Sequence, residues 1–160
     1  MSNKKNILIV VIIAIIITLV VSFIFWMNKK EPEPINLNME QLELDFQTKG
    51  RFEDMKTVKV DKSILLSDFK IEEAFVEEQI GQIPLINIKS SMYVVIKATP
   101  GKSEYVKQRL EEYAINYEKQ WASYLEDQYD LVKKRQIGIN GDYVYLIIAD
   151  TANELKDLIK

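Results

Sequence analysis

Residues 92–125 read MYVVIKATPGKSEYVKQRLEEYAINYEKQWASYL, and this stretch decides the fold. Met92 to Ala98 carries β-branched residues at its centre and lacks a helical period, which predicts a central, largely buried strand. The turn residues Thr99-Pro100-Gly101 end that strand. From Ser103 to about Leu125 the apolar residues recur at spacings of 3 and 4, which predicts one long amphipathic helix. The stripe that we expect to face a sheet consists of Val106, Leu110, Tyr113, Tyr117, Trp121 and Tyr124.

The residues after this helix predict a hairpin. Asp127 and Gln128 break the helical pattern, and Tyr129 to Ile139 has the composition of a strand. Asn140-Gly141 tolerates positive φ and predicts a type I′ turn. Asp142 to Ala149 then returns antiparallel, with apolar residues on both of its faces as an interior strand requires, and Thr151 starts a last helix.

The residues before the quoted stretch add shorter elements. Asn36 to Gln47 predicts a helix capped by Asn38, and Thr57 to Val60 a short strand. Asp61 has the position of an N-cap for a further short helix, Ala74 to Ile80 predicts a strand, and Gly81 to Ser91 connects that strand to the one that starts at Met92. We therefore predict an α+β domain in which helices cover one face of an antiparallel sheet, the long helix chief among them.

An uncharged apolar run precedes this domain. Ile7 to Met27 is 21 residues long and only Thr18 and Ser22 are polar. As a helix it spans roughly 31 Å, the hydrocarbon thickness of a bilayer. Trp26 suits the headgroup region at its end. The sequence thus predicts a transmembrane helix over residues 6–28.

The flanking residues suggest how that helix is oriented. Lys4 and Lys5, within residues 1–5, favour a cytoplasmic N-terminus, and no small-residue cleavage site precedes Met27. We expect an uncleaved signal anchor in the cell membrane, a stiff Pro/Glu spacer over residues 29–35, and an extracytoplasmic domain over residues 36–160.

Composition excludes several function classes. The chain has no Cys and no His, which removes disulfides, thiolate catalysis and the commonest general base and metal ligand. All 24 acidic residues but only 17 of the 21 basic ones follow Lys30, so residues 31–160 carry a formal charge of −7. An acidic domain argues against nucleic acid as a partner.

Several short motifs together resemble one family. They are Phe52-Glu53-Asp54-Met55, Lys97-Ala98, Gly101-Lys102, Gln120-Trp121-x-x-Tyr124-Leu125-x-Asp127-Gln128-Tyr129-x-Leu131-Val132 and Gly141-Asp142-Tyr143-Val144. Over residues 36–155 the chain resembles an uncharacterised family of small, membrane- or lipid-anchored extracytoplasmic proteins of Gram-positive bacteria, catalogued as a domain of unknown function. The resemblance implies no established activity. It implies a partner in the envelope membrane, in particular an O-acyltransferase system that acts on envelope polysaccharides.

One group of residues has the composition of a recognition site. Trp121, Tyr124, Asp127, Gln128 and Tyr129 combine aromatic faces with a carboxylate and an amide, which suits sugar stacking or peptide binding. The competing interpretation is structural, because Trp121 and Tyr124 belong to the apolar stripe and Asp127 and Gln128 are residue types that commonly occur in turns. We expect the structural role to dominate, and we expect Trp121 to be a core residue.

The acidic residues offer weaker candidates. Glu72, Glu73, Glu77 and Glu78 form the densest cluster, but they lack the spacing of a calcium loop, and a solvated edge explains them better. Asp54, Asp68, Asp127 and Asp142 are candidate acids and bases for glycan chemistry, with no pair evident in the sequence. We expect no catalytic residue, metal or cofactor. The predicted function is a membrane-anchored, non-catalytic accessory or binding protein of the cell envelope, and the alternative is a small carboxylate-dependent enzyme that acts on envelope glycan.

Overall fold

The computed structural model describes residues 15, 17–20, 35–86 and 88–160. The chain forms two compact units, Met1–Glu33 and Pro34–Lys160. In the first unit the described residues are helical. The predicted membrane segment 6–28 lies largely outside the described residues, as do residues 1–5 and most of the spacer 29–35. Within the described ranges, no helix has both the length and the apolar character needed to cross a membrane.

A five-stranded antiparallel sheet forms the centre of the second unit, with the order β1-β2-β3-β5-β4. The strands are β1 (Thr57–Lys59), β2 (Val76–Pro84), β3 (Met92–Ala98), β4 (Gln136–Asn140) and β5 (Tyr143–Ile148). The predictions of β3 as the central strand and of β5 as an interior strand are confirmed. In β3 the five consecutive residues Met92 to Ile96 are fully buried, because neighbouring strands and packed helices enclose this strand.

The described helices of this unit lie before, between and after the strands along the chain. They are α2 (Met39–Gly50), α3 (Lys62–Ser67), α4 (Ser103–Trp121), α5 (Glu126–Lys133) and α6 (Ala152–Lys156), with short 3-10 turns at Phe52–Asp54 and Glu73–Phe75. Two predicted N-caps are confirmed. The Asn38 side chain accepts a hydrogen bond from the Gln41 amide at 3.0 Å, and Asp61 accepts one from the Ile64 amide at 2.9 Å.

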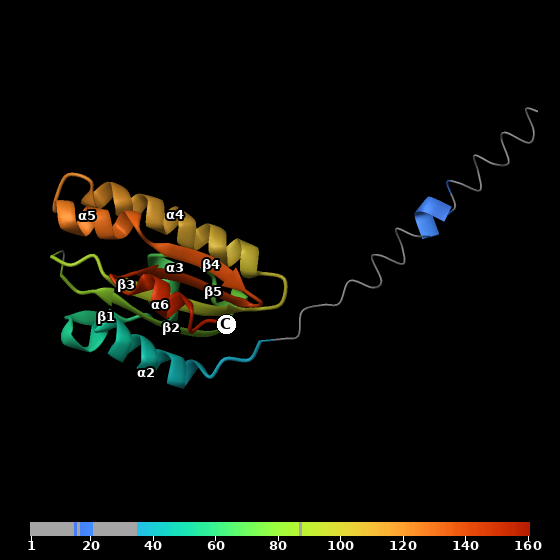
Figure 1. Ribbon diagram of the computed structural model, residues 1–160, viewed down its shortest axis with the longest axis horizontal. Coiled ribbons are helices and arrows are strands. Elements are labelled where there is room, and N and C mark those ends of the chain that lie inside the picture. Colours follow the sequence, from blue (N-terminus) through green and yellow to red (C-terminus); the bar gives the residue numbers. More distant parts are fainter. Residues whose placement is uncertain (1–14, 16, 21–34, 87) are drawn as a thin grey trace, which may run out of the picture. The chain divides into compact units, whose positions relative to one another are not determined.

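Helices cover both faces of the sheet, so the prediction of cover on one face is wrong. Figure 1 shows α4 and α5 above the sheet and α2 below it. Alternate β3 residues belong to two separate cores: Val94 and Ile96 pack with α4, whereas Tyr93 and Val95 pack with α2 and α6. A strand that is apolar on both faces exposes its second face to water unless a second layer covers it.

The segment after α4 is the second correction. The predicted strand Tyr129 to Ile139 is instead α5 followed by β4. Glu126 and Asp127 occupy the first turn of α5 and Lys133 its last, which suits the helix dipole. Gln128 and Val132, four residues apart, are the buried positions of this helix. Tyr129 and Val132 are residue types that are common in strands, which explains the prediction of a strand. In the structure they pack on the core from a short amphipathic helix.

The two hairpins also differ in detail from the prediction. β2 continues past Ile80 to Pro84. A side chain at position 81 would place its Cβ only 2.8 Å from the Tyr93 carbonyl oxygen of β3, so glycine allows the two strands to approach there. Asn140 pairs with Tyr143, so the two turn residues between β4 and β5 are Gly141 and Asp142. Of these two, Gly141 has a positive φ and Asp142 does not. That pattern fits a type II′ turn and not the predicted type I′ turn.

Candidate functional site: an apolar loop fixed by a buried polar network

Two of the five residues of the predicted recognition group, Trp121 and Gln128, are buried, whereas Tyr124 is exposed with its ring centroid 5.7 Å from that of Trp121. Trp121 ends α4 and is 4% exposed, with its ring 6.0 Å from that of Tyr117. Tyr124 lies in the turn before α5 and is 60% exposed. The expectation that Trp121 is a core residue is confirmed, whereas Tyr124 departs from the buried stripe because α4 ends three residues before it.

Asp127, Gln128 and Tyr129 lie in the first half of α5. Gln128 is buried, and its side-chain amide donates a hydrogen bond to Asp127 at 2.9 Å. That donated bond is the main reason why the pKa of Asp127 lies below its usual value. Tyr129 is half-buried against the core, with the Lys133 ammonium 4.4 Å from its ring centroid. Asp127 and Gln128 are therefore bonded to one another, and the Tyr129 ring contacts Lys133.

Gln128 joins α5 to the loop between β2 and β3. Its Oε1 accepts a hydrogen bond from the Ser90 amide at 2.8 Å, and the Ser90 hydroxyl lies 3.1 Å from the Gln128 carbonyl oxygen. From α4, the Tyr117 hydroxyl donates to the Ser90 carbonyl oxygen at 3.3 Å. Burial raises the pKa of Tyr117 to about 12, so this hydroxyl remains a donor at neutral pH. Ser90 and Gln128 are the two buried polar residues of the described chain, and they satisfy one another.

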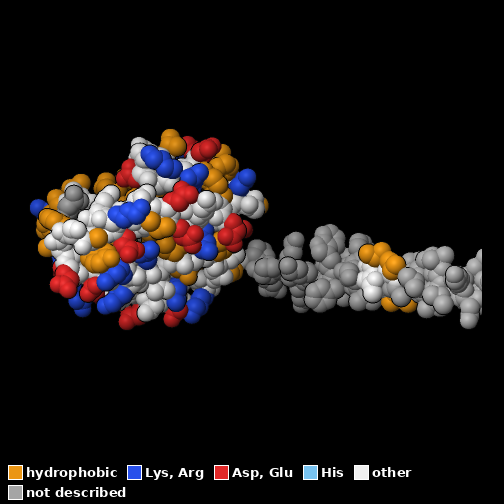
Figure 2. Space-filling view, turned by 90° about the horizontal axis from the view of Figure 1, so that it is seen from above, with side chains coloured by type: hydrophobic (Ala, Val, Ile, Leu, Met, Phe, Trp, Pro, Cys, Tyr) orange, Lys and Arg blue, Asp and Glu red, His pale blue; other side chains and the backbone are white. Residues whose placement is uncertain are grey.

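The residues just before Ser90 form an exposed aliphatic cluster. We call Leu85, Ile86 and Ile88 the apolar loop; they are 64%, 43% and 56% exposed. The Leu85 amide donates to the Lys56 carbonyl at 2.9 Å, and the Ile88 amide donates to the Ile86 carbonyl at 2.9 Å. Figure 2 shows apolar side chains gathered at this end of the domain. Three aliphatic side chains are thus exposed on a segment whose backbone is hydrogen-bonded to Lys56 at one end and, through Ser90, to Gln128 at the other.

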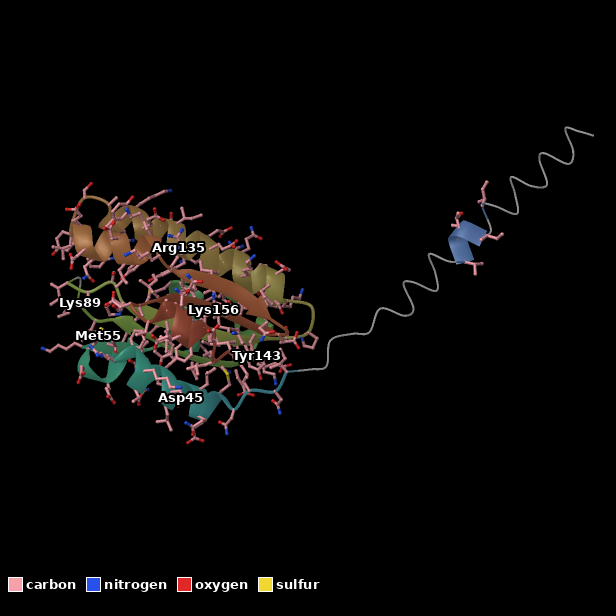
Figure 3. The ribbon with its side chains drawn as sticks, viewed as in Figure 1. Asp45, Met55, Lys89, Arg135, Tyr143 and Lys156 are labelled. Atoms are coloured by element: carbon pink, nitrogen blue, oxygen red, sulfur yellow. The ribbon has the colours of Figure 1, made fainter. Side chains whose placement is uncertain are left out.

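A pocket of about 350 Å³ lies beside the apolar loop. We call it the loop pocket; it is lined by Asp54, Met55, Lys56, Pro84, Ile86, Ile88 and Lys89. Figure 3 shows Met55 and Lys89 at one end of the domain and Tyr143 at the other. None of the five predicted recognition residues lines this pocket. The sequence signal that marks it is Leu85-Ile86-Asn87-Ile88, an aliphatic run between two strands where a solvated turn is normally polar.

A second pocket of about 450 Å³ lies between α4 and the segment after α3. We call it the helix pocket; its lining includes two carboxylates, Asp68 and Glu112. Glu112 accepts a hydrogen bond from Arg109 at 2.7 Å, and Asp68 accepts one from the Ser67 hydroxyl at 2.6 Å. Both acids are therefore engaged by neighbours.

The four aspartates considered for acid and base chemistry are dispersed. Asp54 lines the loop pocket and Asp68 the helix pocket, while Asp127 lies in α5 and Asp142 in the β4–β5 turn. In the acidic cluster, Glu77 lies 3.1 Å and Glu78 3.9 Å from the Lys97 ammonium. Over the described part of the chain, no group of three or more acidic side chains is placed to hold a metal ion.

Comparison with known proteins gives one match. A family model described as a domain of unknown function (DUF4358) matches residues 50–149. It extends from the end of α2 to the residue after β5, and so includes the whole sheet and both pockets. No curated protein and no solved structure matches the chain.

Proposed function

The chain belongs to the family of the DUF4358 domain, and we propose that it is a non-catalytic accessory protein of the cell envelope that binds a protein partner. The observation that carries this proposal is the apolar loop, whose three aliphatic side chains are exposed while the amides of Leu85 and Ile88 are hydrogen-bonded to backbone carbonyls. Exposed apolar area gains free energy when a partner covers it, and backbone that is already hydrogen-bonded has less conformational entropy to lose on binding.

We further propose that one N-terminal helix anchors the domain to the outer face of a Gram-positive cell membrane. The uncharged run Ile7 to Met27, the basic residues 1–5 and the Pro/Glu spacer support this arrangement. Protease added to intact protoplasts should then remove the domain after Lys30. Full protection of the domain, with cleavage after the protoplasts are lysed, would show the opposite orientation.

The partner class that fits this location is another membrane protein of the envelope. The family resemblance suggests an O-acyltransferase system that modifies envelope polysaccharides. The alternative, a carboxylate-dependent enzyme that acts on envelope glycan, would need a pair of carboxylates in one pocket. Asp68 and Glu112 line the helix pocket, where Glu112 accepts a hydrogen bond from Arg109 and Asp68 accepts one from Ser67.

Chemical crosslinking in native membranes tests the binding role. We expect Leu85→Ser, Ile86→Ser and Ile88→Ser in one chain to abolish the crosslinks of the domain to its neighbour. The matched control replaces three other exposed aliphatic residues, Leu44→Ser, Leu66→Ser and Ile115→Ser, and should leave the crosslinks in place. Both variants should fold, because surface substitutions usually change stability by only about 0.5 kcal/mol. Crosslinks that survive the loop variant would contradict the proposal.

A further inference from the structure

The loop pocket has the form of a receptor for a single side chain. It lies between two segments that are distant in sequence: the end of the first 3-10 turn with Met55 and Lys56, and the β2–β3 connection with Pro84 and Ile86. The backbone hydrogen bond from Leu85 to Lys56 joins the two segments. At about 350 Å³ the pocket is at the lower limit for sites that enclose a whole small ligand. The apolar loop forms one wall of this hollow.

Two lysines border this apolar floor. Lys56 and Lys89 line the pocket and are exposed, and neither lies within ion-pair distance of a carboxylate among the described residues. One lining residue, Asp54, is acidic. Lys89 also contributes to the lowered pKa of Asp127, whose carboxylate accepts a hydrogen bond from the Gln128 amide. In a domain of charge −7, the lining of this pocket thus holds two lysines and one aspartate.

From these observations we infer that the loop pocket binds a segment of the partner protein that presents one aliphatic or aromatic side chain next to an acidic residue. The inference rests on the proposed function. The apolar side chain enters between Met55, Pro84 and Ile86, and the carboxylate meets Lys56 or Lys89. Anchors of this kind, buried in a pocket and surrounded by residues that exclude water, carry most of the energy of protein interfaces. The charge pair mainly speeds association and selects the partner.

The shape of the surface favours a protein segment over a lipid bilayer. A bilayer presents a flat surface, which would meet the protruding Leu85 and Ile88 but leave the adjoining hollow unfilled. A side chain from a protein fills it. The pocket also lies at the Met92 end of β3, about 20 Å along the strand from the Ala98 end. At that other end Leu37, which precedes α2, donates its amide to Tyr143, the partner of Lys97 in the sheet. The described residues that lead into the domain therefore leave the pocket open.

Site-specific photocrosslinking of the full chain in its native membranes tests this inference. A benzophenone amino acid replaces Ile86 in the loop, and in a second chain it replaces Ile115, an exposed residue of α4. Each is combined with Lys56→Glu and Lys89→Glu, or with the control pair Lys49→Glu and Lys119→Glu at exposed lysines elsewhere. Mass spectrometry then identifies the crosslinked residue.

We expect the probe at position 86 to attach to a protein segment in which an apolar residue neighbours Asp or Glu. Reversing the pocket lysines should lower the yield about tenfold, since like charges then face one another, and the control pair should leave it unchanged. The inference would be overturned by adducts with lipid, with a second copy of this chain, or with a segment lacking acidic residues. It would also be overturned if Lys56→Glu and Lys89→Glu left the crosslinking yield unchanged. A protein adduct at position 86 with such an unchanged yield would overturn the inference and leave the proposed function standing. Adducts from position 115 but none from position 86 would overturn both, because the partner would then bind α4 and not the apolar loop. The absence of adducts from both positions would overturn both.

Discussion

The hydrogen bonds between Ser90 and Gln128 give the sharpest prediction about stability. In Gln128→Ala the Ser90 amide, buried and 2.8 Å from Oε1, loses its acceptor, and water has no direct access to replace it. An unpaired buried donor costs about 1–3 kcal/mol, and the cavity left by the shortened side chain adds to this. We therefore expect a loss of about 2–4 kcal/mol in the free energy of unfolding, a large part of the stability of a small domain.

The assay is urea unfolding of the domain Pro34–Lys160. Trp121 is its single tryptophan, and this buried ring reports unfolding by fluorescence in every variant that keeps it. The matched control is Asp127→Ala, which removes the exposed partner of the same amide and should cost no more than about 0.5 kcal/mol. Equal losses in the two variants, or a loss below about 1 kcal/mol in Gln128→Ala, would refute the idea that the Ser90–Gln128 hydrogen bond stabilises the domain.

Three further predictions follow from burial. Trp121→Ala should cost about 3–5 kcal/mol by thermal unfolding while Tyr124→Ala changes little, and a fully stable Trp121→Ala would show that this ring is not a core residue. The fragment Pro34–Lys160 should fold by itself, because its apolar residues close two cores without the anchor; expression only as aggregate would mean that the anchor or a partner completes the fold. Burial raises the pKa of Tyr117 from 10.0 to about 12, so above pH 10 the unfolded chain loses the Tyr117 proton more readily than the folded one. The contribution of Tyr117 to stability is therefore complete below pH 10 and is lost as the pH rises toward 12. Tyr117→Phe should flatten that alkaline loss in a pH series of urea midpoints, and an unchanged slope would contradict the assignment.

Local sequence patterns determined the elements that depend on neighbours in the chain. The limits of Met92–Ala98 and the start of Ser103–Trp121 followed from a change of apolar period, and the caps Asn38 and Asp61 followed from a side chain that bonds an amide three residues away. The burial of Trp121 followed from its place on the stripe. In each case the signal is a pattern that repeats within a few residues, so a short window of sequence contains it, although distant segments complete the burial of Trp121.

Tertiary structure alone decided which surfaces remain open. The second helical layer, on the α2 side of the sheet, depends on how segments far apart in the chain pack on β3. The sequence predicts a turn residue at Gln128. In the structure its buried side chain bonds Ser90, 38 residues away, and so joins α5 to the β2–β3 connection. The loop pocket likewise needs Met55 and Ile86 side by side. The sequence places aliphatic residues in the β2–β3 connection, but whether they are covered is set by the whole fold, because burial is a property of every segment that packs nearby.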